Sequence, residues 1–245
     1  MEFAKAQKYV VRVSDSYYLN ENESFILLKL ELVTPDRITF QAGQYVSIKV
    51  NELGERRSYS IASTPDNNHG VTLVAEIIPG GKGSEYIKGL KPGDTVELLA
   101  PLGRFIVDLE TMPKERKLLF VATGSGIAPI YSMINDLLIN KKERRPIRLH
   151  WGMRDEGHIF WFDNFQRLAE EHPYFVFDMV LSKPQEEWEL CTGHVQDCIG
   201  RDLGKEKMGD WEGYVCGSPK MVEELKTLLI KMGMPEEQVH HEKFA

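Results

Sequence analysis

The hydrophobic pattern of this chain of 245 residues changes once, and the change divides the chain into two unlike halves. From Tyr9 to about Ile106, short β-type segments are separated by turn signals rich in proline and glycine. Beyond the polar stretch 108–116, short apolar strands alternate with stretches of helical spacing. The sequence therefore predicts two domains, which span residues 1–110 and 111–245.

The first half predicts an antiparallel six-stranded β-barrel, because six segments of β-type composition follow one another at short, turn-bounded intervals. A sandwich of the same strands is the alternative arrangement. One short helix at about 84–88 interrupts the series. The expected strands are 9–13, 24–33, 44–50, 56–62, 71–78 and 94–100.

The second half predicts a doubly wound α/β domain, in which helices cover both faces of a parallel five-stranded sheet. Strand and helix alternate throughout this half, and helical spacing is clear in 125–140 and 219–232. The expected strands are 117–122, 147–153, 174–181, 211–217 and 239–244.

The composition is that of an ordinary globular protein, with 42% hydrophobic and 27% charged residues. The net charge of −7 gives no reason to expect binding to nucleic acid. The sequence contains no apolar run of membrane-spanning length and no signal-peptide core at its start. We therefore expect a cytoplasmic protein without a transmembrane segment, present as a monomer or a weak dimer.

The cysteines and histidines predict no metal site. Cys191, Cys198 and Cys216 are too few and too unevenly spaced for a disulfide framework or a zinc site. A cluster of four cysteines, which an iron–sulfur centre would need, is missing from the sequence. The histidines form no pair comparable to HExxH.

The stretch RRSYSIAS, at 56–63, is unusual for a strand with one buried face. Arg57 and Tyr59 are two residues apart and point to the same side of an ideal pleat, whereas Ser58 and Ser60 point to the other side. An edge strand with a solvated face explains this pattern without any ligand. The motifs that follow favour a different explanation.

A glycine-rich turn, VATGSGIAP at 121–129, joins the first strand of the second half to its first helix. Gly124 and Gly126 let the backbone turn sharply and approach a ligand, and Pro129 suits the first helical turn. Free N–H groups at a helix start favour an anion such as phosphate, and the carboxyl end of a strand is where open α/β sheets bind ligands. The spacing is not GxGxxG, so the turn is either a phosphate cradle or a plain connection.

Two further motifs also precede helices. Residues 80–84 read GGKGS and predict either a second phosphate nest or a glycine-rich hairpin turn. Residues 214–221 read YVCGSPKM, in which a strand ends at Cys216 and a helix begins through Pro219. No histidine partner for Cys216 is evident, so this residue is a small buried hydrophobe rather than a nucleophile.

Taken in order, RSYSIAS, GGKGS, ATGSGIAP and YVCGSPKM resemble the ferredoxin–NADP⁺ reductase superfamily, a family of electron-transfer flavoproteins. The resemblance extends from the barrel to the C-terminal EKF. It implies a flavin-binding barrel domain followed by a nicotinamide nucleotide-binding α/β domain. It also implies bound FAD, with FMN the less common flavin in the family, and NADH or NADPH as co-substrate.

The resemblance assigns the RSYSIAS strand to the flavin. Arg57 would hold the pyrophosphate of FAD in a bidentate manner, Tyr59 would stack on the isoalloxazine ring, and Ser60 would hydrogen-bond near its N5 atom. The implied flavin site consists of Arg57, Ser58, Tyr59, Ser60, Ser63, Glu76, Ile77, Gly81, Lys82, Gly83 and Ser84.

The resemblance assigns the turns of the second half to the nicotinamide nucleotide. Catalytic roles fall to Ser60 and Glu242, which would handle protons or orient the ring, and to Cys216, which would shape the pocket beside the nicotinamide. The implied nucleotide site consists of Thr123, Gly124, Gly126, Pro129, Arg154, Cys216, Gly217, Met221 and Phe244.

Two features leave alternatives open. Arg154 could grip a 2′-phosphate whereas Asp155 would repel one, and we expect a slight preference for NADH because no second basic residue stands close by in sequence; Lys183 or Arg201 could still reach the site. Phe244 is followed by Ala245, whereas plant-type members end in a tyrosine, so Phe244 either covers the flavin or lines the nicotinamide pocket.

The function implied by the resemblance is hydride transfer from NAD(P)H to FAD, followed by electron transfer to a separate acceptor. A protein carrier such as ferredoxin or flavodoxin, an oxygenase component and a small molecule are all candidate acceptors. One alternative is an NAD(P)H-dependent reductase of free flavin. Another is an electron-transfer subunit that is active only within a larger complex.

Overall fold

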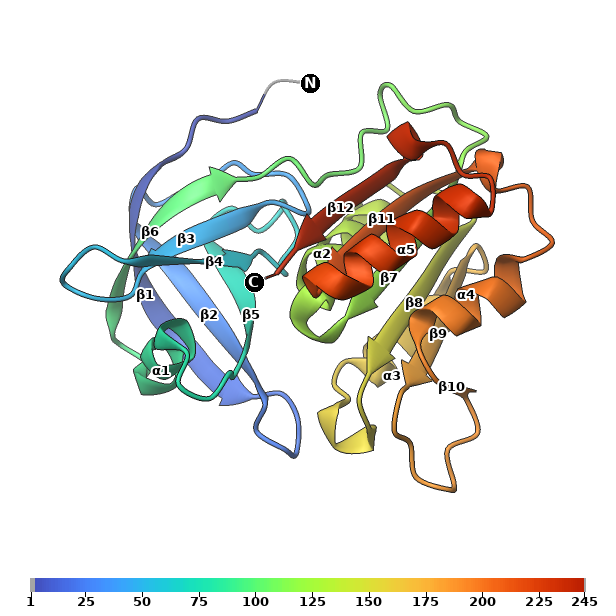
Figure 1. Cartoon of the computed structure of the whole chain (residues 1–245). Coiled ribbons are helices and arrows are strands. Elements are labelled where there is room, and N and C mark those ends of the chain that lie inside the picture. The colour runs from blue at the N-terminus through green and yellow to red at the C-terminus, as the bar shows by residue number, and fades with distance from the viewer. Residues whose placement is uncertain (1–2, 245) are drawn as a thin grey trace. The chain divides into compact units, whose positions relative to one another are not determined.

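The computed structural model describes residues 3–244 (Figure 1). The chain forms two compact units. The first comprises the chain up to Asp108 together with residues 128–141, and the second comprises residues 109–127 and the chain from Lys142 onward. The boundary between residues 110 and 111 that the sequence suggests remains a prediction.

The first unit contains the antiparallel sheet, with strands in the order β4-β3-β6-β1-β2-β5. A bridge between Ile61 and Leu73 and a hydrogen bond from Ala62 N to Thr72 O (2.8 Å) connect the region after β4 with β5. The sheet is thereby nearly closed into the expected six-stranded barrel. Its strands are β1 (Gln7–Tyr18), β2 (Phe25–Thr34), β3 (Tyr45–Lys49), β4 (Arg56–Ser60), β5 (Gly70–Glu76) and β6 (Thr95–Leu102).

The alternation of side chains places the barrel core. In β1, Tyr9, Val11 and Val13 are buried whereas the residues between them are exposed, as a period of two requires. These residues share one hydrophobic core with Leu28, Leu30 and other inward-facing residues of the remaining strands. Burial of such side chains contributes about 1.5–3 kcal/mol each, and this burial stabilises the barrel.

The second unit contains a parallel sheet in the order β10-β9-β8-β7-β11-β12. The five expected strands are present, and the expected fold class is confirmed. A sixth strand, β10, has only two residues, too few to leave a hydrophobic pattern in the sequence. The strands are β7 (Lys117–Thr123), β8 (Ile147–Met153), β9 (Phe175–Leu181), β10 (Cys191–Thr192), β11 (Trp211–Gly217) and β12 (Val239–Lys243).

The helices of the second unit cover both faces of the sheet (Figure 1). Helices α4 and α5 share one hydrophobic core with β7, β9, β11 and β12. Helix α3 covers the opposite face through Phe165, whose ring lies 5.8 Å from that of Trp151 and 5.0 Å from that of Phe177. The α-helices of the chain are α1 (Lys82–Gly89), α2 (Ile127–Asn135), α3 (Phe162–Glu171), α4 (Val195–Leu203) and α5 (Pro219–Lys231).

Single turns of tighter or wider helix connect several of these elements. They are η1 (Gly124–Gly126), η2 (Asp136–Asn140, a π turn), η3 (Glu156–His158), η4 (Met208–Asp210) and η5 (Glu236–Gln238). Among residues 3–244, no helix combines the length and the apolar character that crossing a membrane would need.

Strand β8 places two neighbouring large side chains on opposite faces of the sheet. Trp151 points toward α3, so His150 points toward α4. His150 is fully buried, and within the described chain neither ring nitrogen has a hydrogen-bond partner. Its Nδ1 atom lies 3.7 Å from Asp178 Oδ2 and 3.9 Å from Asp202 Oδ2. Burial lowers the pKa of His150 to about 4, against a smaller opposite effect of the Asp202 charge.

We predict that this buried histidine makes the fold sensitive to acid. Between pH 6.5 and about 4 an unfolded chain protonates this histidine and the folded protein does not, so stability falls as the pH falls through this window. The loss from this residue is at most about 3 kcal/mol. The pKa of the Asp178 carboxyl is raised by burial and by the Asp202 charge, which offsets part of the loss.

Urea unfolding at neutral and at mildly acidic pH measures this effect. The variant His150→Gln should lose part of the pH dependence, because glutamine does not titrate. The matched variant His241→Gln should keep it, because His241 is exposed. Equal pH dependence in the two variants would contradict the prediction.

Candidate functional site

Strand β4 carries the unusual stretch of the first unit. Arg57 is exposed, Tyr59 is half-buried and Ser60 is buried, with 2% of its surface exposed. A Cβ atom on Gly83, in the first turn of α1, would lie 2.5 Å from Tyr59 Oη and 3.0 Å from Arg57 Cγ. Arg57 and Tyr59 therefore share one side of β4, as the pleat predicts, and both lie against the start of α1.

The two arginines of this strand are in different environments. Arg56 donates from Nη1 to Glu97 Oε1 (2.9 Å) and from Nη2 to the Ser47 carbonyl oxygen (2.7 Å), which links it to the barrel. Arg57 donates from Nη1 to the Arg56 carbonyl oxygen (2.8 Å) and otherwise extends into solvent. Of the two arginines, Arg57 is the exposed one.

Tyr59 keeps its proton at any physiological pH. Burial raises the pKa of Tyr59 to about 12, although the positive charge of Arg57 acts in the opposite direction. Its ring packs against the barrel core. A neutral, half-buried aromatic ring beside an exposed guanidinium suits a ligand that has both a flat ring system and an anionic part.

The turn before α1 is held by its own side chains. Ser84 accepts a hydrogen bond from Ile78 N (2.9 Å) and donates one to the Glu76 carbonyl oxygen (3.2 Å). Lys82 binds both carboxylate oxygens of Glu55 (2.8 and 2.9 Å), and this contact holds the pKa of Glu55 below its usual range. An anion at α1 would therefore meet the backbone N–H groups of its first turn more readily than these two side chains.

The remaining flavin-site candidates surround this turn and strand β5. Ser63 accepts a hydrogen bond from Thr72 N (3.1 Å), so its hydroxyl already joins two segments of the barrel. Ile77 is half-buried and donates from its backbone N to Ser24 O (2.8 Å), whereas Glu76 and Ser58 are exposed.

The centre of the parallel sheet brings the nucleotide-site candidates together. Strand β7 has β8 on one side and β11 on the other, so the order of the strands reverses at β7. Open α/β sheets bind ligands at such a reversal, beyond the carboxyl ends of the strands. Thr123 ends β7, and Cys216 and Gly217 end β11.

Two glycines allow the backbones to meet there. A Cβ on Gly126 would lie 2.3 Å from the Cys216 carbonyl oxygen, and a Cβ on Gly217 would lie 2.3 Å from Thr123 Oγ1 and 2.3 Å from Met221 Cε. Gly124 has a φ of 54°, a conformation that side chains disfavour. The carbonyl oxygen of Gly124 also accepts a hydrogen bond from Trp151 Nε1 (3.2 Å). Pro129 is the third residue of α2 and is buried.

The end of the chain lies beside the same strand. In the parallel pairing of β11 with β12, Glu242 lies opposite Cys216, and Phe244 N donates to Gly217 O (3.0 Å). Cys216 is fully buried, and burial, with the Glu242 charge as a smaller cause, raises the pKa of its thiol well above the usual range. A protonated buried thiol fits a packing role rather than nucleophilic attack.

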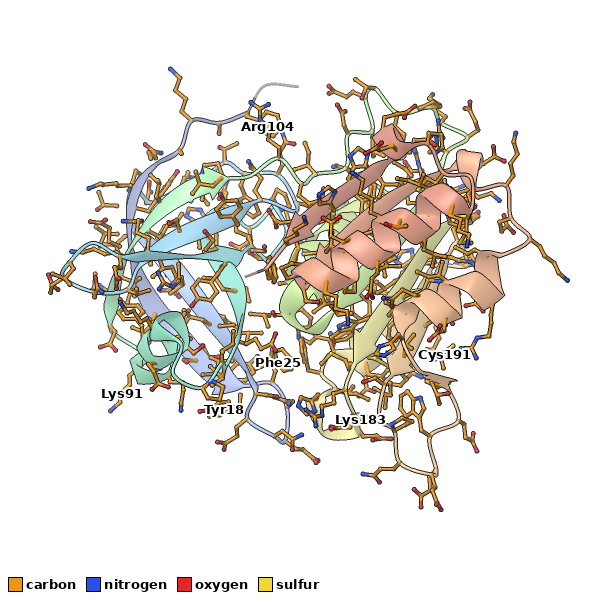
Figure 2. The ribbon with its side chains drawn as sticks, viewed as in Figure 1. Tyr18, Phe25, Lys91, Arg104, Lys183 and Cys191 are labelled. Atoms are coloured by element: carbon orange, nitrogen blue, oxygen red, sulfur yellow. The ribbon has the colours of Figure 1, made fainter. Side chains whose placement is uncertain are left out.

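Arg154 follows β8 and is well exposed. Its Nε atom lies 3.9 Å from Asp155 Oδ2, and Asp155 also contacts His158 Nδ1 through Oδ1 (2.5 Å). Lys183 follows β9 (Figure 2). Its backbone N donates to the Arg154 carbonyl oxygen (2.7 Å), so the segment after β9 runs next to Arg154. The fold thus brings a second basic residue near Arg154, as well as an acidic one.

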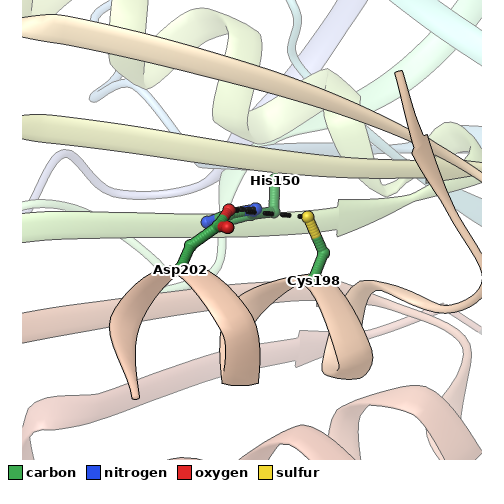
Figure 3. A group of neighbouring side chains, drawn as sticks. All are labelled: His150, Cys198 and Asp202. Carbon is green, nitrogen blue, oxygen red and sulfur yellow. Dashed lines mark hydrogen bonds and ion pairs between the residues drawn. The ribbon is translucent and has the colours of Figure 1, made fainter. Parts of the chain in front are cut away.

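One group of chemically active side chains was not expected from the sequence. His150, Cys198 and Asp202 place their nitrogen, sulfur and oxygen atoms within 4.8 Å of one another (Figure 3). They come from β8 and from α4, far apart in the sequence, so no spacing motif could reveal them. A second sulfur, that of Cys191, lies beside Cys198.

The residues present fit a dinucleotide in each unit. On the barrel, Gly83 lacks the Cβ that would separate the α1 N-terminus from Arg57 and Tyr59. On the parallel sheet, Gly126 and Gly217 lack the Cβ atoms that would fill the turn at the strand reversal. Donors for a diphosphate therefore lie at helix starts that close contacts at glycine hold in place.

Comparison with known proteins gives two family matches. The family described as Oxidoreductase FAD-binding domain matches residues 12–106, and the family described as Oxidoreductase NAD-binding domain matches residues 120–227. Together they account for most of the chain, and they confirm the expected cofactors, FAD and a nicotinamide dinucleotide.

Two of the relatives are named as reductase components of oxygenases. The chain is 32% identical over 220 residues to reductase component 1 of terephthalate 1,2-dioxygenase from Comamonas sp., which covers 89% of this chain and 63% of the relative. It is 33% identical over 208 residues to the reductase component of phenol 2-monooxygenase from Pseudomonas sp. strain CF600, which covers 84% of this chain and 58% of the relative. The chain thus spans about three fifths of the length of these two relatives.

A solved structure of similar fold is a cytochrome P450 reductase from Amycolatopsis. It superimposes with a TM-score of 0.89 at 28% identity, over 98% of this chain and 70% of that protein. Both family matches, the relatives and this fold agree with the four motifs, and the chain belongs to the ferredoxin–NADP⁺ reductase superfamily.

Proposed function

We propose that this chain is an NAD(P)H-dependent flavoprotein reductase that passes electrons through FAD to a separate acceptor. The observation that supports this most strongly is the close approach of Gly83 to Arg57 and Tyr59, which sets a helix N-terminus, a cation and an aromatic ring side by side. A plain edge strand would not require a glycine at that contact. FAD, when bound, accepts a hydride from the nicotinamide and can release electrons one or two at a time.

On the barrel, the residues of this chain bind and orient. Arg57 would neutralise the diphosphate of FAD together with the first-turn N–H groups of α1. Tyr59 would hold the flavin ring by stacking, and its raised pKa keeps it neutral while it does so. Ser60, buried at the end of β4, would orient the reacting edge of the ring by a hydrogen bond.

On the parallel sheet, the residues of this chain position the donor. Thr123, Gly124 and Gly126 would hold the nucleotide diphosphate at the turn after β7. Cys216 would line one side of the nicotinamide pocket. Its buried thiol stays protonated, so it would pack against the ring rather than attack it. Glu242 and Phe244 lie on the neighbouring strand and just after it, where they would exclude water and limit the motion of the ring. Holding the reactants in position in this way can lower the barrier to hydride transfer by about 7–11 kcal/mol.

We further propose that the electron acceptor is an oxygenase component or an electron carrier that serves one. The relatives with about a third identity are named as reductase components of a dioxygenase and of a monooxygenase, which supports this class of partner. Among donors we favour NADH, because the carboxylate of Asp155 lies beside Arg154 and would repel a 2′-phosphate. Lys183, brought close by the fold, is the residue that could reverse this preference.

We predict that a reduced nicotinamide nucleotide bleaches the visible absorbance of FAD bound to the purified protein under anaerobic conditions. A visible spectrum recorded during titration, first with NADH and then with NADPH, measures both the reaction and the donor. Bleaching at lower concentration by NADH is the expected result. A protein that acquires no flavin spectrum when mixed with FAD or FMN would overturn the proposed function. Rapid loss of flavin on gel filtration, with activity on added flavin, would indicate a reductase of free flavin instead.

We predict that Arg57→Ala weakens FAD binding by about 10- to 100-fold, because a charge-assisted hydrogen bond to an anion is worth roughly 1.5–3 kcal/mol. Equilibrium titration of apoprotein with FAD, followed by flavin fluorescence, gives the dissociation constant. The matched control is Arg12→Ala, which removes another exposed arginine of the barrel, on β1, and should leave the constant unchanged. Equal effects of the two variants would argue against the role given to Arg57.

We predict that Gly126→Ala slows flavin reduction by NADH by about 10- to 100-fold, because its Cβ would displace the turn from the Cys216 backbone. FAD binding should be unaffected, because this turn belongs to the second unit. Gly200→Ala is the control, since nothing lies within 4 Å of the added Cβ in α4. Stopped-flow absorbance measures the rate, and loss of FAD binding in Gly126→Ala would contradict the assignment.

A further inference from the structure

Two cysteines of the second unit lie in direct contact. Cys191, in β10, and Cys198, in α4, have their sulfur atoms 2.6 Å apart. A disulfide bond has an S–S distance of about 2.0 Å, so the two sulfurs need to move only slightly to become bonded. Both residues are free cysteines in this structure.

Regular structure on both sides produces this contact. Cys191 pairs with Val180 in the β-ladder, and its carbonyl oxygen accepts a hydrogen bond from Trp188 Nε1 (3.1 Å). Cys198 is the fourth residue of α4, whose start is fixed by a capping box between His194 and Asp197. The proximity of the two sulfurs is therefore part of the fold and not an accident of a loop.

The two thiols differ in exposure and in their neighbours. Cys191 is half-buried, so a reagent in solution can reach it, and Arg201 Nη2 lies 3.5 Å from its sulfur. Cys198 is fully buried, and burial raises the pKa of its thiol. The S–H of Cys198 donates to Asp202 Oδ2 (3.5 Å). Cys191 is thus suited to react first and Cys198 to follow.

We propose that Cys191 and Cys198 form a reversible redox pair, which closes into a disulfide when the protein meets a peroxide. Hydrogen peroxide first converts the Cys191 thiol to a sulfenic acid and releases one water. The sulfur of Cys198 then attacks that sulfur, the S–S bond forms, and the hydroxyl group leaves as a second water with the proton of Cys198. Two thiols lose two electrons in total, and the peroxide gains them. A dithiol reductant reverses the process.

The pair lies next to the end of β8. The Cγ1 atom of Val195, in the first turn of α4, would be 2.8 Å from a Cβ on Gly152, the last residue but one of β8. Leu181, at the end of β9, accepts a hydrogen bond from Gly193 N (2.9 Å), and Lys183 N, two residues further on, donates one to the Arg154 carbonyl oxygen (2.7 Å). A cross-link between β10 and α4 would therefore fix the segments that flank Arg154.

A metal ion bound by His150, Cys198 and Asp202 is the competing explanation of this cluster (Figure 3). The contacts of Cys198 favour the redox pair, because its sulfur lies 2.6 Å from Cys191 Sγ and 3.5 Å from Asp202 Oδ2. Two thiolates bound to one zinc ion would lie farther apart than the 2.6 Å between these sulfurs, because each Zn–S bond is about 2.3 Å long and the ligands are arranged tetrahedrally.

The test counts thiols in the full chain. The reduced, unfolded protein should give three reactive thiols, and the protein pretreated with one to two equivalents of hydrogen peroxide should give one. Dithiothreitol should restore the count to three. The tryptic peptide that carries both cysteines should be lighter by two hydrogen atoms after oxidation. Three thiols after peroxide, or loss of thiols only through links between chains, would overturn the proposal.

Variants assign the bond to these two residues. In Cys216→Ser, peroxide should lower the number of reactive thiols from two to none, because the two cysteines that remain are Cys191 and Cys198. Cys198→Ser should stop at a sulfenic acid on Cys191, which a sulfenic-acid reagent labels, and Cys191→Ser should react slowly with peroxide. An intramolecular disulfide in either pair variant would assign the bond to Cys216 and overturn the proposal. If the purified protein contains stoichiometric zinc and Cys198→Ser does not, the cluster is a metal site and the proposal is overturned.

We also expect the disulfide to change the KM for NADH, an expectation that rests on the proposed function. The KM for NADH should change at least threefold between the oxidised and reduced protein, and should be insensitive to peroxide in Cys191→Ser. An unchanged KM despite complete disulfide formation would reject the coupling to the nucleotide site. A protein that forms the disulfide but is never bleached by NADH would reject the proposed function and leave the redox pair standing.

Discussion

Close packing at glycine residues is the constraint on which both candidate sites depend. In the second unit, Gly126 lies against the Cys216 carbonyl, so the turn after β7 touches the end of β11 without any side chain between them. In the first unit, Gly83 brings the start of α1 against the side chains of Arg57 and Tyr59. A methyl group at either place would push a helix N-terminus away from the surface that it serves. The anion-binding capacity of these helix starts is useful only because the contact holds them there.

The order of the elements could be predicted from the sequence, and so could the residues that share one side of β4, because both follow from short-range periodicity. Alternation in β4 correctly puts Arg57 and Tyr59 on one side. Alternation alone does not explain why Ser58 is exposed and Ser60 is buried, although both point to the other side. The difference arises at the end of β4, where the chain continues into the bridge between Ile61 and Leu73 that joins it to β5. Such long-range closure leaves no local pattern.

The roles of polar side chains were harder to predict, because a polar residue can serve either a ligand or the fold. The sequence makes Ser84 and Lys82 look like phosphate ligands, whereas the structure shows Ser84 bonded to the turn before α1 and Lys82 paired with Glu55. The roles assigned to them in flavin binding remain predictions. The sequence gives no sign that His150 and Cys198 are neighbours, because a strand and a helix far apart in the chain bring them together. Tertiary contacts of this kind are invisible to motif spacing.

The neighbours of each cysteine, more than its burial, decide what chemistry it can carry. Cys198 and Cys216 are both fully buried, and burial raises both pKa values, so neither thiol is a nucleophile by itself. Cys216 ends β11, where the backbone of Gly126 packs against it and the nicotinamide is proposed to bind. Cys198 instead contacts a second sulfur on β10, which is half-exposed and lies beside a guanidinium. Thiol oxidation at Cys191 and Cys198 would then act at the β10 edge of the sheet, away from β11, where the hydride donor is proposed to bind.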